Sequence, residues 1–147
     1  MHAMEISRTG LEVEWRRLEV ISENLANAGT VRTAGGGAYQ PRHLISGPRG
    51  EFSAYLDRSH ASATAQDERL DGVMVYAIEP DATPPRRAHE PDNPQADADG
   101  FVTYPAINHA EQMVLMAKTA RVYEANIVAM NTARQMYAKA LELGMRG

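Results

Sequence analysis

The chain has 147 residues, no cysteine and a formal net charge of −4 at pH 7. This charge provides no basic surface for nucleic acid, and the lack of cysteine excludes disulfides, thiolate nucleophiles and sulfur-ligated metals. No stretch approaches the roughly 20 apolar residues of a membrane span, and the N-terminus lacks a signal-peptide pattern. We therefore expect no nucleic-acid partner, no direct membrane insertion and no cleavable signal.

The first predicted element is a helix from Met4 to Ala28. Its apolar residues recur every seven positions, and others fill the same face, which is typical of an amphipathic helix. This face consists of Met4, Leu11, Trp15, Leu18, Ile21 and Leu25. Gly29 follows where a helix C-terminus is expected, and Gly10 in the middle allows a bend or a close approach.

The helical period is lost between Thr30 and Pro105. A connector is predicted at Gly35–Gly37, and four segments are predicted to be short strands, of which Gly72–Ile78 is the best because it is rich in β-branched and aromatic residues. These strands are Ala38–Ser46, Glu51–Leu56, Gly72–Ile78 and Phe101–Tyr104. Prolines are frequent between Glu79 and Gly100, so this stretch is predicted to be an extended loop rather than a strand or helix.

The last predicted element is a helix from Ala106 to Leu143. Asn108, with Glu111 three residues later, forms an Asn version of the capping box at its start. An apolar seam with alternating spacings of three and four follows, and Arg134 is its one charged break, which is typical of a coiled coil. The seam consists of Met113, Met116, Ala120, Tyr123, Ile127, Met130, Tyr137 and Leu141. Such a helix would be about 57 Å long, so part of it must find partners outside its own fold.

The predicted fold is therefore mainly α with a small β-rich insert. The long N- and C-terminal helices form a coiled-coil-like pair in one domain, residues 1–29 plus 106–147. Residues 30–105 form the insert, a middle segment of short strands and Pro/Gly-rich loops.

The sequence contains no pattern that predicts catalytic, metal or cofactor chemistry. The five His residues have no partner at metal-ligand spacing. Gln95–Gly100 resembles the start of a calcium loop, but its first residue is Gln95, and Ala106 stands where the bidentate Glu is required. Gly35–Gly37 lacks the lysine of a phosphate-binding loop. We therefore expect that the protein is not an enzyme and binds no cofactor and no small-molecule substrate.

Three segments carry a more specific signal than composition. Ile21–Ala28 contains Asn-Leu-Ala-Asn-Ala, Tyr123–Asn131 begins with Tyr-Glu-Ala-Asn, and Glu90–Val102 contains Glu-Pro-Asp-Asn-Pro-Gln-Ala-Asp. Together with the ending Leu-Glu-Leu-Gly at Leu141–Gly144, they resemble the rod proteins of the bacterial flagellar basal body, and among these a proximal-rod component. The resemblance covers nearly the whole chain, most firmly residues 18–34 and 89–144. Residues 47–69 match poorly.

The resemblance implies a structural function in the bacterial flagellum and its motility. Members of this family pack their terminal helices into the axial structure, with copies of themselves and other flagellar rod proteins as partners. They leave the cytoplasm through the flagellar type III export apparatus with an uncleaved N-terminus and assemble in the periplasm, where the rod transmits torque. A different rod or axial component and a self-contained coiled-coil adaptor are the alternatives.

Asparagines beside the seams of both helices suggest how register could be fixed. Asn24 precedes Leu25 and Asn126 precedes Ile127, and an amide beside a coiled-coil seam penalises a slipped neighbour. A solvated position, or a helix C-terminus for Asn27, is the competing interpretation. The predicted assembly interface consists of Leu11, Leu18, Ile21, Asn24, Leu25, Asn27, Met113, Met116, Ala120, Tyr123, Asn126, Ile127, Met130, Asn131, Tyr137 and Leu141.

Overall fold

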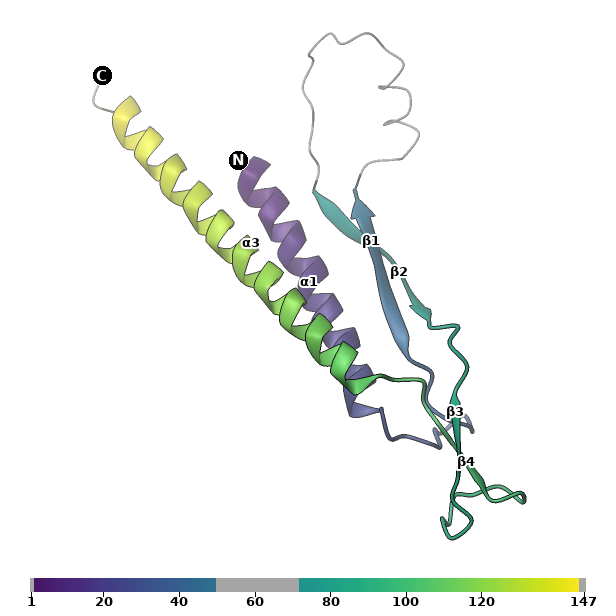
Figure 1. Ribbon diagram of the computed structural model, residues 1–147. Coiled ribbons are helices and arrows are strands. Elements are labelled where there is room, and N and C mark those ends of the chain that lie inside the picture. Colours follow the sequence, from purple (N-terminus) through teal and green to yellow (C-terminus); the bar gives the residue numbers. More distant parts are fainter. Residues whose placement is uncertain (1, 50–71, 146–147) are drawn as a thin grey trace, which may run out of the picture. The chain divides into compact units, whose positions relative to one another are not determined.

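Two long helices and four short strands make up the computed structural model, which describes residues 2–49 and 72–145 (Figure 1). The helices are α1 (His2–Ala26) and α3 (His109–Gly144), and they stand at the two ends of the chain. The strands are β1 (Arg42–Pro48), β2 (Val73–Pro80), β3 (Arg86–His89) and β4 (Phe101–Tyr104). The expectation of a mainly helical fold with a small β insert is confirmed.

Both helices begin and end close to the predicted positions because their end signals are local. Asn108 caps α3, since its Oδ1 accepts a hydrogen bond from the Glu111 backbone N–H at 3.3 Å. At the end of α1, the Asn27 side chain donates to the Glu23 carbonyl oxygen at 2.9 Å. The same carbonyl oxygen also accepts the Asn27 backbone N–H at 3.1 Å, so Asn27 bonds twice to the last turn of the helix.

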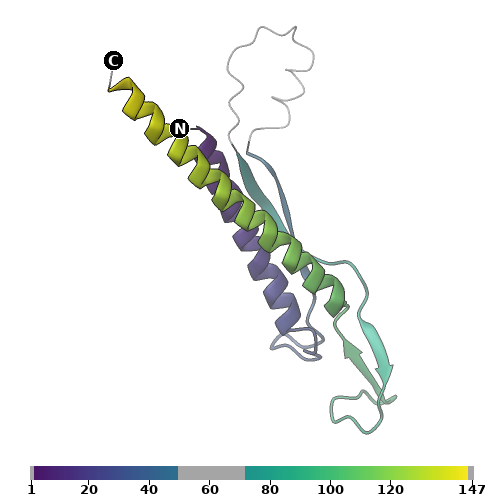
Figure 2. The same ribbon diagram turned by 60° about the vertical axis from the view of Figure 1, so that its left-hand side comes forward.

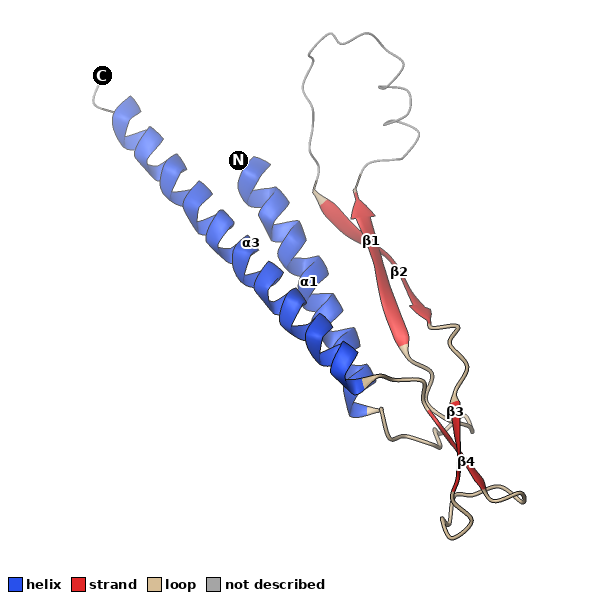
Figure 3. Ribbon diagram, viewed as in Figure 1, coloured by secondary structure: helices blue, strands red, loops and turns tan. Residues whose placement is uncertain are grey.

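The strands β1 and β2 pair in a two-stranded sheet and run in opposite directions (Figure 3). β1 extends through Gly47 and Pro48, where the sequence predicted a break. The lack of a side chain at Gly47 leaves room for the Tyr76 ring, because a Cβ at this position would lie 2.6 Å from that ring. The Tyr76 hydroxyl also donates to the Pro48 carbonyl oxygen at 2.5 Å. The predicted strand Glu51–Leu56 lies outside the described residues.

The prediction of a continuous loop from Glu79 to Gly100 is wrong at its start, where β2 extends to Pro80, and at β3. Arg86–His89 pairs antiparallel with β4, with Arg86 opposite Tyr104 and His89 opposite Phe101. The prolines of this region flank the strand instead of interrupting it, so its ladder hydrogen bonds are not blocked. β4 itself has the predicted bounds.

The chain forms two compact units, and both helices contribute to each. The first unit comprises Met1–Trp15, Ser46–Tyr76 and Ala120–Gly147, and the second comprises Arg16–Ile45 and Ala77–Thr119. Within each unit a stretch of α1 lies beside a stretch of α3 (Figures 1 and 2). The predicted division into a helical domain and an insert stays a prediction.

The described core is small and partly polar. Its buried apolar side chains are Val13, Val20, Ile21, Leu44 and Val102, and its buried polar residues are Ser7, Thr9, Asn24 and Thr119. The buried face of α1 therefore differs from the predicted one. Ile21 is buried, Leu11, Leu18 and Leu25 are only half-buried, and Trp15 is exposed. The reason is that α1 contacts both α3 and the β segments.

Candidate assembly interface

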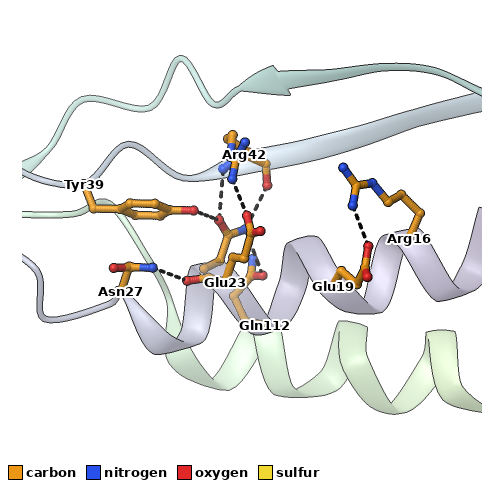
Figure 4. Close-up of polar contacts among 8 residues, drawn as sticks. Arg16, Glu19, Glu23, Asn27, Tyr39, Arg42 and Gln112 are labelled. Carbon is orange, nitrogen blue, oxygen red and sulfur yellow. Dashed lines mark hydrogen bonds and ion pairs between the residues drawn. The ribbon is translucent and has the colours of Figure 1, made fainter. Parts of the chain in front are cut away.

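Asn24 is a buried residue of the second unit, not a side chain on a free surface. Its partners Tyr39, Arg42 and Gln112 are labelled in Figure 4. Its Oδ1 accepts the Arg42 backbone N–H at 3.0 Å and the Tyr39 hydroxyl at 3.1 Å. Its Nδ2 donates to the Arg42 carbonyl oxygen at 2.8 Å and to Gln112 Oε1 at 3.4 Å. The two oxygen lone pairs and two N–H groups of the amide are thus all used.

These hydrogen bonds join three elements of the second unit. Arg42 at the start of β1 receives a two-point backbone contact from Asn24, and its guanidinium forms an ion pair with Glu23 of α1. Hydrogen bonding with Tyr39, and then the charge of Glu23, raise the pKa of Arg42 above its ordinary value. The hydrogen bond to Gln112 connects the first turns of α3 to Asn24. Asn24 therefore fixes the position of β1 against α1 within one chain.

In the first unit, small residues of α1 allow close contacts on two sides. The Thr9 hydroxyl donates to the Ile6 carbonyl oxygen and accepts the Val73 backbone N–H at 3.1 Å. A Cβ at Gly10 would lie 3.0 Å from the Asn126 amide atoms. Gly10 is therefore a site of close approach, as the sequence allowed, and Asn126 of α3 is its neighbour.

Aromatic packing adds a contact between the helices of the same unit. The ring centroids of Trp15 and Tyr123 are 6.2 Å apart, with an interplanar angle of 47°. Both residues were assigned to apolar seams, and the Trp15 ring reaches its neighbour while much of it stays exposed.

The residues of the predicted α3 seam form two groups that differ in solvent exposure. Met116, Ala120, Tyr123, Ile127 and Met130 are half-buried, and Asn126 joins them on that face. Met113, Tyr137 and Leu141 are exposed, as is Asn131. The side chain of α3 that is most deeply buried is Thr119, next to the seam position Ala120. Whether the exposed positions contact other subunits stays a prediction.

The β3–β4 hairpin is held by charged groups around its rings and loop. Arg87 lies over the Phe101 ring at 4.6 Å and forms an ion pair with Asp97 at 2.7 Å. The Asp97 carboxylate accepts the backbone N–H of Phe101 at 2.8 Å and that of Asp99 at 3.1 Å. The Phe101 N–H contributes most to holding the pKa of Asp97 below its ordinary value.

Sequence reasoning missed the partners of these contacts. Thr9, Gln112 and Gly72 carry no motif, and their contacts join residues far apart in the chain. The adjacent small residues Thr9 and Gly10 are a signal that other segments could approach α1 closely at this point, on more than one side.

Within residues 2–49 and 72–145, no three acidic, histidine or cysteine side chains lie close enough together to hold a metal ion. None of the described helices is long and apolar enough to span a membrane.

Comparison with known proteins identifies the relatives of this chain. Residues 98–143 match the family described as Flagellar basal body rod FlgEFG protein C-terminal. A protein of Borreliella burgdorferi named flagellar basal-body rod protein FlgC is 33% identical over 153 residues, which cover 96% of this chain and 95% of the relative.

Two further proteins with the same name align over similar lengths. That of Bacillus subtilis is 33% identical over 148 residues, or 97% of both chains. That of Salmonella typhimurium is 31% identical over 144 residues, covering 98% of this chain and 97% of the relative. The chain therefore belongs to the FlgC family of flagellar basal-body rod proteins.

Proposed function

We propose that this chain is a non-enzymatic structural subunit of the flagellar basal-body rod and forms part of the shaft that carries torque. The observation that carries the proposal is the near full-length similarity to rod proteins named FlgC. A similarity of this extent includes both long helices and the β segments between them. The proposal therefore concerns the whole chain and not a shared fragment.

The proposed mechanism is polymerisation through the terminal helices. Apolar side chains along α3 remain exposed in the single chain, including Met113, Tyr137 and Leu141. Exposed apolar surface on a long helix favours association, because contact with another subunit removes that surface from water. The half-buried members of both seams support the packing of α1 against α3 and border this surface.

The proposed partners are copies of this chain, other flagellar rod proteins and the flagellar type III export apparatus. The proposed location is the periplasmic rod of the basal body, reached without a cleavable signal peptide. The formal net charge of −4 agrees with a protein that has no nucleic-acid partner. Small-molecule substrates and direct membrane insertion have no part in this proposal.

Deletion of the gene tests the proposal. Basal bodies purified from the deletion strain should lack the rod in electron micrographs, and the cells should not swim. The wild-type gene supplied in trans should restore both. Intact rods and normal swimming in the deletion strain would contradict the proposed function and favour a self-contained coiled-coil adaptor.

A further inference from the structure

We draw no further inference here: the strongest candidate, the cavity of the second unit that Leu44 of β1 and Leu115 of α3 help to line, carries none, because nothing in the part of the chain that the structure describes shows what fills it.

Discussion

At the scale of single residues, Asn24 connects segments of the same chain through its hydrogen bonds. Asn24→Asp keeps the acceptors for Arg42 N–H and Tyr39 but removes the donors to the Arg42 carbonyl oxygen and Gln112. A buried acceptor left without its donor costs about 1–3 kcal/mol, so we expect urea unfolding to show a loss of this size. Asn131→Asp, at an exposed position of α3, is the control and should be near neutral. A stable Asn24→Asp variant that fails only in assembly would favour the interface role instead.

Gly72 is the second residue whose identity the structure requires. Its φ is +82°, and a Cβ there would lie 2.2 Å from Thr9 Oγ1, the atom that accepts the Val73 N–H. Gly72→Ala should therefore cost about 1–2 kcal/mol for the left-handed backbone, and more for displacing Thr9. Gly36→Ala isolates the backbone cost, since Gly36 has φ +81° and no atom within 4 Å of its Cβ position. Equal losses in thermal or urea unfolding of the two variants would show that the Thr9 contact contributes nothing.

At the scale of elements, the β3–β4 hairpin should respond to acid. The pKa of Asp97 is lowered in the folded state, chiefly by the Phe101 N–H, so its ionised form stabilises the loop above the unfolded pKa of about 4. This contribution is lost as the pH falls through the lowered folded pKa. The pKa of Glu90 is lowered as well, first by Asn93 and then by Tyr104, and its contribution has the same sign.

The amide NMR signal of Phe101 can follow this loss. We expect the signal to keep its folded position at neutral pH and to shift as the pH falls below about 4. Asp97→Ala should show the shifted signal already at neutral pH, because the acceptor is missing. Asp92→Ala, which removes a nearby exposed carboxylate, should behave as the wild type. A pH-independent Phe101 signal in the wild type would contradict the role of Asp97.

At the scale of the whole molecule, we propose that the same helix contributes to folding and to assembly through neighbouring side chains. Ile127 is half-buried in the first unit, whereas Val128 is exposed. Ile127→Asp should lower the free energy of unfolding by about 1–3 kcal/mol and abolish rod assembly. Val128→Asp should change the stability of the single chain by no more than about 0.5 kcal/mol. Chemical unfolding and electron microscopy of basal bodies measure the two effects, and normal swimming with Ile127→Asp would contradict the seam assignment.

The sequence alone determined the features that depend on neighbours in the chain. The apolar period predicted both helices, and Asn108 and Glu111 marked the start of α3. Phe101–Tyr104 was predicted as a short strand with the observed bounds of β4. The motifs around Asn24, Asp92 and Asn126 carried the family resemblance, which the comparisons confirm. Periodicity and capping are local properties, so a single sequence is sufficient to show them.

Only the tertiary structure decided which polar groups meet. The hydrogen-bond partners of Asn24 lie 15, 18 and 88 residues away in the chain, and Thr9 contacts Val73, which is 64 residues away. β3 was missed because Arg86–His89 has no apolar alternation and becomes a strand through its pairing with β4. The buried face of α1 also differed from the periodic one, since α1 is covered from two directions. A period in the sequence shows that a helix has an apolar face, but the positions of its neighbours determine which residues are buried.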